Sequence, residues 1–361
     1  MARMPDSFLD CVVTSPPYYG LRSYGTEPQI WGGNEFCDHV WGEAMPFAKQ
    51  DNRTLEEKIA QGASVGSNQK FNNENTTASS GNFCQLCNAW RGELGLEPTF
   101  QLYIAHLIDI FREVKRVLKP TGTVWVNLGD SFASAFPCNR RNVVDQGSPD
   151  NATIRTSRLS GTLREKSLTN IPSRFAIAMT DELQFIQRNN IIWHKPACMP
   201  SSAKDRFTVD FENILFFTKE PKYWFEQQLE PLAEVSIARV SQPNYSNQAE
   251  SIGNGGAKTN GNMKAVIGSL DGRNMRTTWT VNFEPSGEEH YASYPTRLIE
   301  IPIKAGCPEG GIVYDPFGGT ATTAVTAHKL GRQWICSELQ PKYAKIANKR
   351  LEPYLMQESL F

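Results

Sequence analysis

The chain has 361 residues, a length that suits one large domain with insertions or two average domains. Its 37 Lys and Arg residues balance 38 Asp and Glu residues, so a nucleic-acid site must be a local basic patch. Hydrophobic residues make up 40% and charged residues 21%, which excludes the disordered, collagen-like and coiled-coil classes.

No stretch approaches the roughly 18 apolar residues of a membrane span, and the first residues lack the apolar core of a signal peptide. The eight cysteines are too few for a disulfide scaffold, and their uneven spacing indicates another use in a reducing compartment. We therefore expect a soluble, cytoplasmic protein.

Short apolar strands alternate with amphipathic helices along most of the chain. The first half predicts a parallel βαβ unit from a strand at 12–15, a helix at 102–118 and a strand at 123–128. The second half predicts helices at 171–188, 322–330 and 342–351, and strands at 191–193, 213–218, 312–315 and 333–336. This order predicts an α/β fold with a doubly wound, mostly parallel sheet that helices cover on both faces.

Three polar segments interrupt this order. Residues 50–82 are rich in Asn, Ser, Thr, Gln and Gly, a composition that predicts a flexible insertion. Residues 138–170 and 239–276 carry more basic than acidic side chains and predict loops. Such loops are either ordinary solvated surface or contacts for a polyanion.

The residues Thr14-Ser15-Pro16-Pro17-Tyr18 end the first predicted strand. The prolines fix the backbone, so the Ser15 hydroxyl and nearby carbonyl groups are held as acceptors beside the Tyr18 ring. Acceptors that bind both hydrogens of an exocyclic amine favour its pyramidal form, whose lone pair can attack a methyl group. An aromatic ring can stack on a base that has left the duplex. The motif indicates chemistry on the amino group of a base; the alternative is a plain proline-rich strand end.

A glycine-rich motif, Asp315-Pro316-Phe317-Gly318-Gly319-Thr320-Ala321-Thr322-Thr323, follows a predicted strand and opens a helix. Such a turn lets a ligand approach the backbone at the amino end of the helix. Glu338 ends the next predicted strand, where a carboxylate can hold ribose hydroxyls. We expect an adenosyl ligand; the alternative is a tight turn without a ligand.

With these motifs in this order, the chain resembles the β class of amino-methylating DNA methyltransferases. The (D/N/S)PPY motif of that family matches residues 15–18, and its DPFxGxGTT motif matches residues 315–323. The resemblance implies a Rossmann-like methyltransferase domain that uses S-adenosylmethionine and flips a base out of double-stranded DNA. It implies that the catalytic residues are Ser15, Pro16, Pro17 and Tyr18. It also implies that the cofactor contacts are Asp315, Phe317, Gly319, Thr322 and, for the ribose, Glu338.

The resemblance covers most of the chain, because residues 194–196, 199–202, 204–206 and 290–295 also match family landmarks. It implies a catalytic half at 1–232 with an insertion at about 31–95, a target-recognition insertion at 233–289 and a cofactor-binding half at 290–361. We expect the basic segments 138–170 and 239–276 to contact phosphates. The sequence leaves open whether a restriction endonuclease is a partner, and it does not give the oligomeric state.

Two features depart from the family pattern. Ala321 replaces the second glycine of the motif, and its methyl group is accommodated if its φ is negative. Family members also carry a strand with an acidic residue upstream of the catalytic loop, whereas only thirteen residues precede Thr14 here. We hypothesise an N-terminal truncation or a misassigned start that weakens the adenine pocket.

Two pairs of soft ligands flank the polar insertion, Cys37 with His39 and Cys84 with Cys87. This arrangement is typical of a closed Cys3His structural zinc site, and a metal there would join the two ends of the insertion. Similar insertions occur in phage-type members of the family. The alternative is unrelated thiols and a surface histidine. We interpret His106 and His328, which lie in predicted helices, as structural.

Ser15 bears on which base is modified. Serine before the two prolines resembles the cytosine-N4 enzymes, whereas adenine-N6 enzymes usually have Asp or Asn at this position. We expect N4 methylation of cytosine in double-stranded DNA, with adenine N6 as the alternative. Two rival functions are methylation of an RNA or protein amide, and an inactive, zinc-containing DNA-binding remnant.

Overall fold

The computed structural model of the chain describes residues 1, 3–42, 82–133, 163–234, 237–238, 272–283 and 294–358. The predictions for 50–81, 138–162 and 239–271 lie outside these residues. The chain forms two units. Unit 1 comprises Met1–Pro16, Ile110–Gly129 and Pro172–Phe361, and unit 2 comprises Pro17–Asp109 and Asp130–Ile171.

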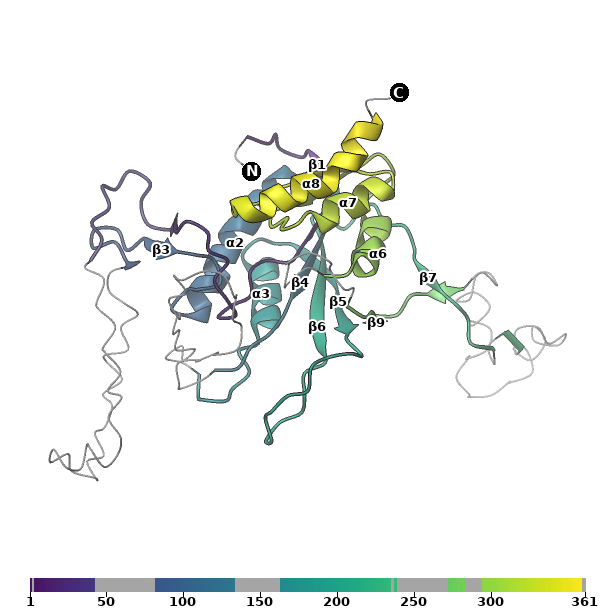
Figure 1. Cartoon of the computed structure of the whole chain (residues 1–361), viewed down its shortest axis with the longest axis horizontal. Coiled ribbons are helices and arrows are strands. Elements are labelled where there is room, and N and C mark those ends of the chain that lie inside the picture. The colour runs from purple at the N-terminus through teal and green to yellow at the C-terminus, as the bar shows by residue number, and fades with distance from the viewer. Residues whose placement is uncertain are drawn as a thin grey trace, which may run out of the picture. The chain divides into compact units, whose positions relative to one another are not determined.

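Unit 1 contains a seven-stranded sheet with the order β11-β10-β1-β4-β6-β5-β9 (Figure 1). Its strands are β1 (Leu9–Thr14), β4 (Leu118–Leu128), β5 (Ile186–His194), β6 (Phe211–Thr218), β9 (Thr278–Thr280), β10 (Ile312–Asp315) and β11 (Gln333–Cys336). β6 runs antiparallel to β4 and β5, and every other pair of neighbours is parallel. The predicted parallel pairing of β1 with β4 and the mostly parallel sheet are both confirmed.

Helices cover both faces of the sheet, because alternate strand residues point to opposite sides. The main helices are α2 (Phe100–Val117), α3 (Ile171–Asp181), α6 (Thr296–Gly306), α7 (Thr322–Lys329) and α8 (Pro341–Glu358). On one face, Trp125 of β4 shares a buried cluster with Ile303 of α6. On the other, Phe217 of β6 contacts the edge of Phe175 of α3, which in turn contacts Phe111 of α2. No helix within the described ranges is long and apolar enough to cross a membrane.

Three of the elements that differ from the prediction belong to the central sheet or the helices against it. The helix predicted to reach Arg188 ends at Asp181, because Gln184 adopts a left-handed φ of 54° and the Phe185 amide bonds back to the Met179 carbonyl. Helix α6 was not predicted, and it contains Pro302, a residue that normally ends a helix. Strand β9 lies within the predicted recognition insertion at 233–289 but belongs to the central sheet.

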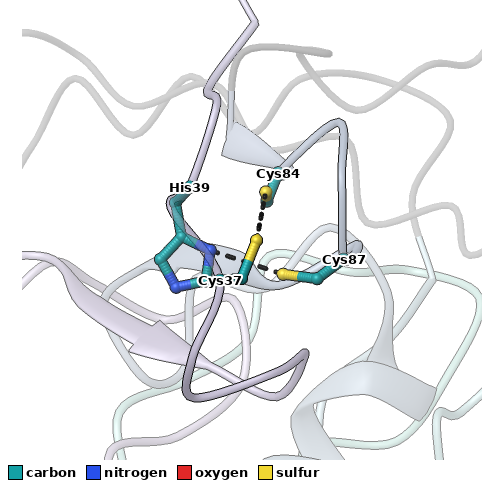
Figure 2. Close-up of side chains that lie close together, drawn as sticks. All are labelled: Cys37, His39, Cys84 and Cys87. Carbon is teal, nitrogen blue, oxygen red and sulfur yellow. Dashed lines mark hydrogen bonds between the residues drawn. The ribbon is translucent and has the colours of Figure 1, made fainter.

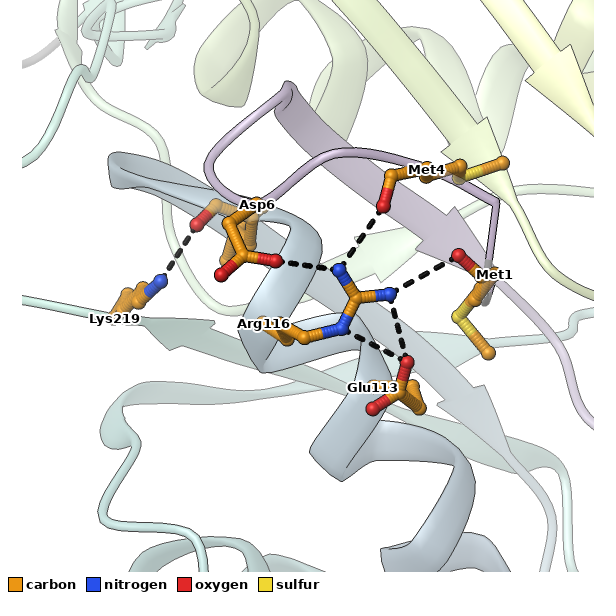
Figure 3. A network of polar contacts seen from close by, with 7 residues as sticks. Met1, Met4, Asp6, Glu113, Arg116 and Lys219 are labelled. Atoms are coloured by element: carbon orange, nitrogen blue, oxygen red, sulfur yellow. Dashed lines mark hydrogen bonds and ion pairs between the residues drawn. The ribbon is translucent and has the colours of Figure 1, made fainter.

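Arg116, near the carboxyl end of α2, anchors the segment that precedes β1 (Figure 3). Its guanidinium donates hydrogen bonds to the carbonyl groups of Met1 and Met4 and pairs with Asp6 at 2.6 Å and with Glu113 at 2.8 Å. These carboxylates, Glu113 foremost, raise the pKa of Arg116. The network fixes the direction in which the chain enters β1.

Unit 2 contains a small antiparallel pair, β2 (Gln29–Trp31) with β3 (Trp90–Gly92). Trp31 and Trp90 stack on the ring of His106, with ring centroids 4.9 and 5.4 Å away. His106 Nδ1 lies 2.9 Å from Glu97 Oε1, and both side chains are buried. These contacts are those of a core histidine, which agrees with the structural role inferred for His106.

Ala321, the residue immediately before α7, differs from the expectation in its backbone conformation. Its φ is 64° and its ψ is 32°, so the negative φ that would accommodate the methyl group is not present. The side chain is buried in a cluster with Ala324, Val325 and Leu351. A left-handed conformation costs a non-glycine residue roughly 1–2 kcal/mol, so this turn is strained.

Replacing Ala321 with glycine should separate this strain from the packing of the methyl group. We expect Ala321→Gly to change the free energy of unfolding by less than about 1 kcal/mol, because relief of the strain offsets the loss of a buried methyl, about 0.8 kcal/mol. Ala324→Gly, in the right-handed helix beside it, should lose about 2 kcal/mol from methyl burial and helix propensity together. The free energy of unfolding of both variants is measured in urea. If both variants lost the same free energy, the backbone at Ala321 would not be strained.

Candidate active site

The two predicted motifs meet at one edge of the sheet in unit 1. β1 and β10 are parallel neighbours, with Cys11 opposite Val313 and Val12 opposite Tyr314. The chain therefore leaves both strands at the same carboxyl edge, the usual ligand-binding edge of an open α/β sheet. There the Thr14 hydroxyl donates a 2.6 Å hydrogen bond to Asp315 Oδ1.

The Asp315 carboxylate is buried and is bonded entirely by groups of the chain. Oδ1 also accepts a bond from the Phe317 amide at 3.0 Å. Oδ2 accepts bonds from the Tyr294 hydroxyl at 3.0 Å and from the Thr323 hydroxyl at 2.5 Å. Burial raises the pKa of Asp315, and these donors oppose the rise. These donors come from different parts of unit 1, so Asp315 orders the loop, and its predicted contact with the cofactor stays a prediction. The sequence analysis placed Thr14 and Tyr294 in motifs but did not predict that they bond Asp315.

Glu338, which follows β11, is a carboxylate that remains able to accept further bonds. Its Oε2 accepts from the Gly319 amide at 2.8 Å and its Oε1 from the Gln340 amide at 2.7 Å. The Leu339 amide also interacts with this carboxylate, which leaves it fewer donors than Asp315 has and at least one lone pair for a ligand. The side chain is half-buried, and burial raises its pKa. This arrangement suits a group that donates a hydroxyl, as a ribose does.

The remaining predicted cofactor residues lie on the loop between β10 and α7. Phe317 and Gly319 are half-buried, whereas Thr322 is only 7% exposed and opens α7. A Cβ added to Gly318 would lie 2.8 Å from Cys336 Cβ, so glycine is required where the loop crosses β11. Of the predicted cofactor residues on this loop, Phe317 and Gly319 are more accessible than Asp315 and Thr322.

The four predicted metal ligands lie together in unit 2 (Figure 2). Cys37 Sγ is 3.9 Å from Cys84 Sγ, and His39 Nδ1 is 3.3 Å from Cys87 Sγ. All four ligand atoms lie within 4.8 Å of one another. Backbone pairing of Trp41 with Cys84 joins the two segments that carry them.

The predicted phosphate-binding segments are described only in part. In the segment 239–276, Arg273 and Arg276 both donate to Glu230 Oε1, at 2.7 and 2.6 Å. Arg273 lies in the two-stranded ribbon of β7 (Leu229–Glu230) and β8 (Arg273–Asn274). Glu230 therefore neutralises part of the positive charge that the sequence places here.

The catalytic motif begins in unit 1 and continues into unit 2. Ser15 is half-buried and Pro16 is buried, directly after β1, while Pro17 and Tyr18 are half-buried. Within unit 2, the buried Tyr103 of α2 donates its hydroxyl to the Pro17 carbonyl at 2.7 Å. Burial raises the pKa of Tyr103, so this hydroxyl keeps its proton. Tyr103 thus positions the second half of the motif, a role the sequence pattern gave no sign of.

Removing this hydroxyl should loosen the loop that carries Tyr18. We expect Tyr103→Phe to lower the free energy of unfolding by about 1 kcal/mol, the usual net value of one hydrogen bond. Hydrogen exchange at the amides of residues 18–21 should become faster, while exchange in β11 should not change. Unchanged exchange at 18–21 would show that Tyr103 does not hold the loop.

Comparisons with known proteins match nearly the whole chain. Residues 9–349 match the model of a family described as DNA methylase, of the N6/N4 type. Type II methyltransferase M.SmaI of Serratia marcescens is 28% identical over 348 residues, 96% of this chain and 86% of the relative. Type II methyltransferase M.Cfr9I of Citrobacter freundii is 29% identical over 353 residues, 98% of this chain and 84% of the relative.

Among solved structures, PvuII DNA methyltransferase (cytosine-N4-specific) aligns with 96% of this chain and 80% of its own, with 16% identity and a TM-score of 0.49. The family model spans nearly the whole chain and both motifs of the candidate site. The chain therefore belongs to the N6/N4 DNA methylase family.

Proposed function

We propose that this protein transfers a methyl group from S-adenosylmethionine to the exocyclic amino group of cytosine in double-stranded DNA. The observation that carries the proposal is the hydrogen bond between Thr14 and Asp315. It joins the end of the strand that leads into Ser15-Pro16-Pro17-Tyr18 to the start of the glycine-rich loop. The motif proposed to bind the amine and the loop proposed to bind the methyl donor thus start at the same edge of the sheet.

The residues at this edge fit the methyl donor. Glu338 can accept a hydrogen bond from a ribose hydroxyl, and Phe317 and Gly319 are accessible on the loop. When bound, S-adenosylmethionine supplies an electrophilic methyl group. The part of Asp315 is to hold the loop in shape through its four internal hydrogen bonds.

The amine is prepared by acceptors of the catalytic motif. The Ser15 hydroxyl and the Pro16 carbonyl accept hydrogen bonds from its two N–H groups, which frees the nitrogen lone pair for attack. The nitrogen–methyl bond forms as the methyl–sulfur bond breaks, and one N–H proton is then released to solvent. Tyr18 stacks on the flipped base and fixes the direction of attack. Because serine precedes the prolines, we favour cytosine N4 over adenine N6.

Mass spectrometry of the product tests both the reaction and the base. The protein is incubated with unmethylated duplex DNA and S-adenosylmethionine, and the DNA is digested to nucleosides. We expect N4-methylcytosine, and Ser15→Ala should lower the rate at least about tenfold by removing one acceptor of the amine.

Other products would contradict parts of this proposal. N6-methyladenine would keep the mechanism but make the choice of cytosine wrong. DNA binding without any methylated nucleoside would instead support the inactive DNA-binding remnant.

We further propose that Cys37, His39, Cys84 and Cys87 hold a structural zinc ion. A tetrahedral site with zinc–sulfur bonds of about 2.3 Å has sulfur–sulfur edges of about 3.8 Å. The Cys37–Cys84 separation of 3.9 Å is close to this value. Four protein ligands leave no open position for substrate, so the ion would act on the fold of unit 2 and not on the chemistry.

Metal analysis of the purified protein tests the zinc site. We expect one zinc ion per chain, with most of it lost in Cys84→Ser because three remaining ligands bind zinc more weakly. Cys198→Ser is the matched control, since Cys198 lies outside the cluster, and it should keep its zinc. A wild-type content far below one zinc ion per chain, or full zinc in Cys84→Ser, would contradict the proposal.

A further inference from the structure

Residues 195–210 form a loop that joins β5 to β6 and projects beyond the ends of both strands (Figure 1). β5 and β4 are both antiparallel to β6, and β4 is parallel to β1. The carboxyl end of β5 therefore lies at the same edge of the sheet as the end of β1. The loop and Ser15 leave the sheet of unit 1 at this common edge.

Two large apolar side chains of this loop are almost fully exposed. Phe207 is 96% exposed and Met199 is 88% exposed. Isolated apolar residues are common on protein surfaces, but an aromatic ring with nearly all of its area in water is unusual. Lys204 and Arg206 place positive charge immediately before Phe207, with Asp205 between them.

The base of the loop is held closed, which presents the exposed residues on a fixed support. The Lys195 amide donates to the Asp210 carbonyl at 2.7 Å, and the Lys195 ammonium pairs with Glu212. The same ammonium lies 4.3 Å from the centre of the Trp193 ring. His194 also faces Asp210, at 3.7 Å.

We propose that Phe207 enters the base stack of duplex DNA and fills the space that the target nucleotide leaves when it is extruded. Base extrusion loses stacking, and an inserted apolar side chain restores part of it. The basic residues beside Phe207 suit phosphates, which favours DNA over an apolar protein surface as the occupant. Met199 adds apolar surface to the same loop. This inference rests on the proposed base-flipping reaction.

The test compares two DNA substrates whose extrusion costs differ. The recognised sequence is first located by footprinting. One duplex has the target base paired, and the other has an abasic site opposite it, so that less pairing is lost on extrusion. Initial rates give kcat/KM for wild type, Phe207→Ala, Phe207→Trp and the control Ile177→Ala, which truncates another exposed apolar side chain, on α3.

We expect Phe207→Ala to lose about tenfold or more in kcat/KM on the paired duplex and less than about threefold on the abasic duplex. Phe207→Trp should stay within about threefold of wild type on both, because a larger ring also stacks. Ile177→Ala should match wild type on both. With 2-aminopurine at the target position, Phe207→Ala should show a smaller rise in fluorescence on binding than wild type does.

Three outcomes would overturn the proposal. Equal losses on both duplexes would show that Phe207 acts on folding or cofactor binding, and thermal unfolding would identify the first of these. No loss on either duplex would mean that the exposed ring serves a different partner, such as a protein. An unchanged 2-aminopurine signal would rule out insertion even if wild type made no methylated product, so this inference and the proposed function fail separately.

Discussion

The hydrogen bond from the Thr14 hydroxyl to the Asp315 carboxylate is the contact on which the candidate site depends. A buried carboxylate is costly unless donors surround it. Here the donors come from β1, from the glycine-rich loop, from α7 and from Tyr294. The hydrogen bonds that the buried Asp315 carboxylate requires thus hold the end of β1 against the end of β10. The end of β1 and the start of the glycine-rich loop therefore cannot shift independently, although most of the chain lies between them.

The sequence predicted the sheet well because its strands are short apolar runs with clear ends. β10 and β11 match their predicted bounds, and the β1–α2–β4 unit has the predicted order and direction. The failures have local causes. The sequence pattern around Gln184 is helical, but a left-handed turn there ends the helix. Helix α6 was not predicted because it contains Pro302. β9 is too short for its alternation to be recognised.

The sequence predicted the residues of the site, but it did not predict how differently the two carboxylates of the cofactor group are bonded. Asp315 and Glu338 are both acidic, both follow strands and both belong to the predicted cofactor group. The structure adds a difference in their surroundings, because the carboxylate of Asp315 has more donors from the chain than that of Glu338. Thr14 and Tyr294, which supply two of those donors, lie in recognised motifs, but neither motif indicates a bond to Asp315. Contacts over such separations leave no local pattern.

The pairing of Trp41 with Cys84, together with the bond from the Gln85 amide to the Val40 carbonyl, brings two distant parts of unit 2 together. A chain segment that starts and finishes at the same place adds little closure entropy as it lengthens, because the cost grows only with the logarithm of its length. With its two ends joined in this way, the segment between them has a length that hardly affects the stability of the unit around it. A change in the number of residues between Trp41 and Cys84 should accordingly alter the free energy of unfolding of unit 2 very little.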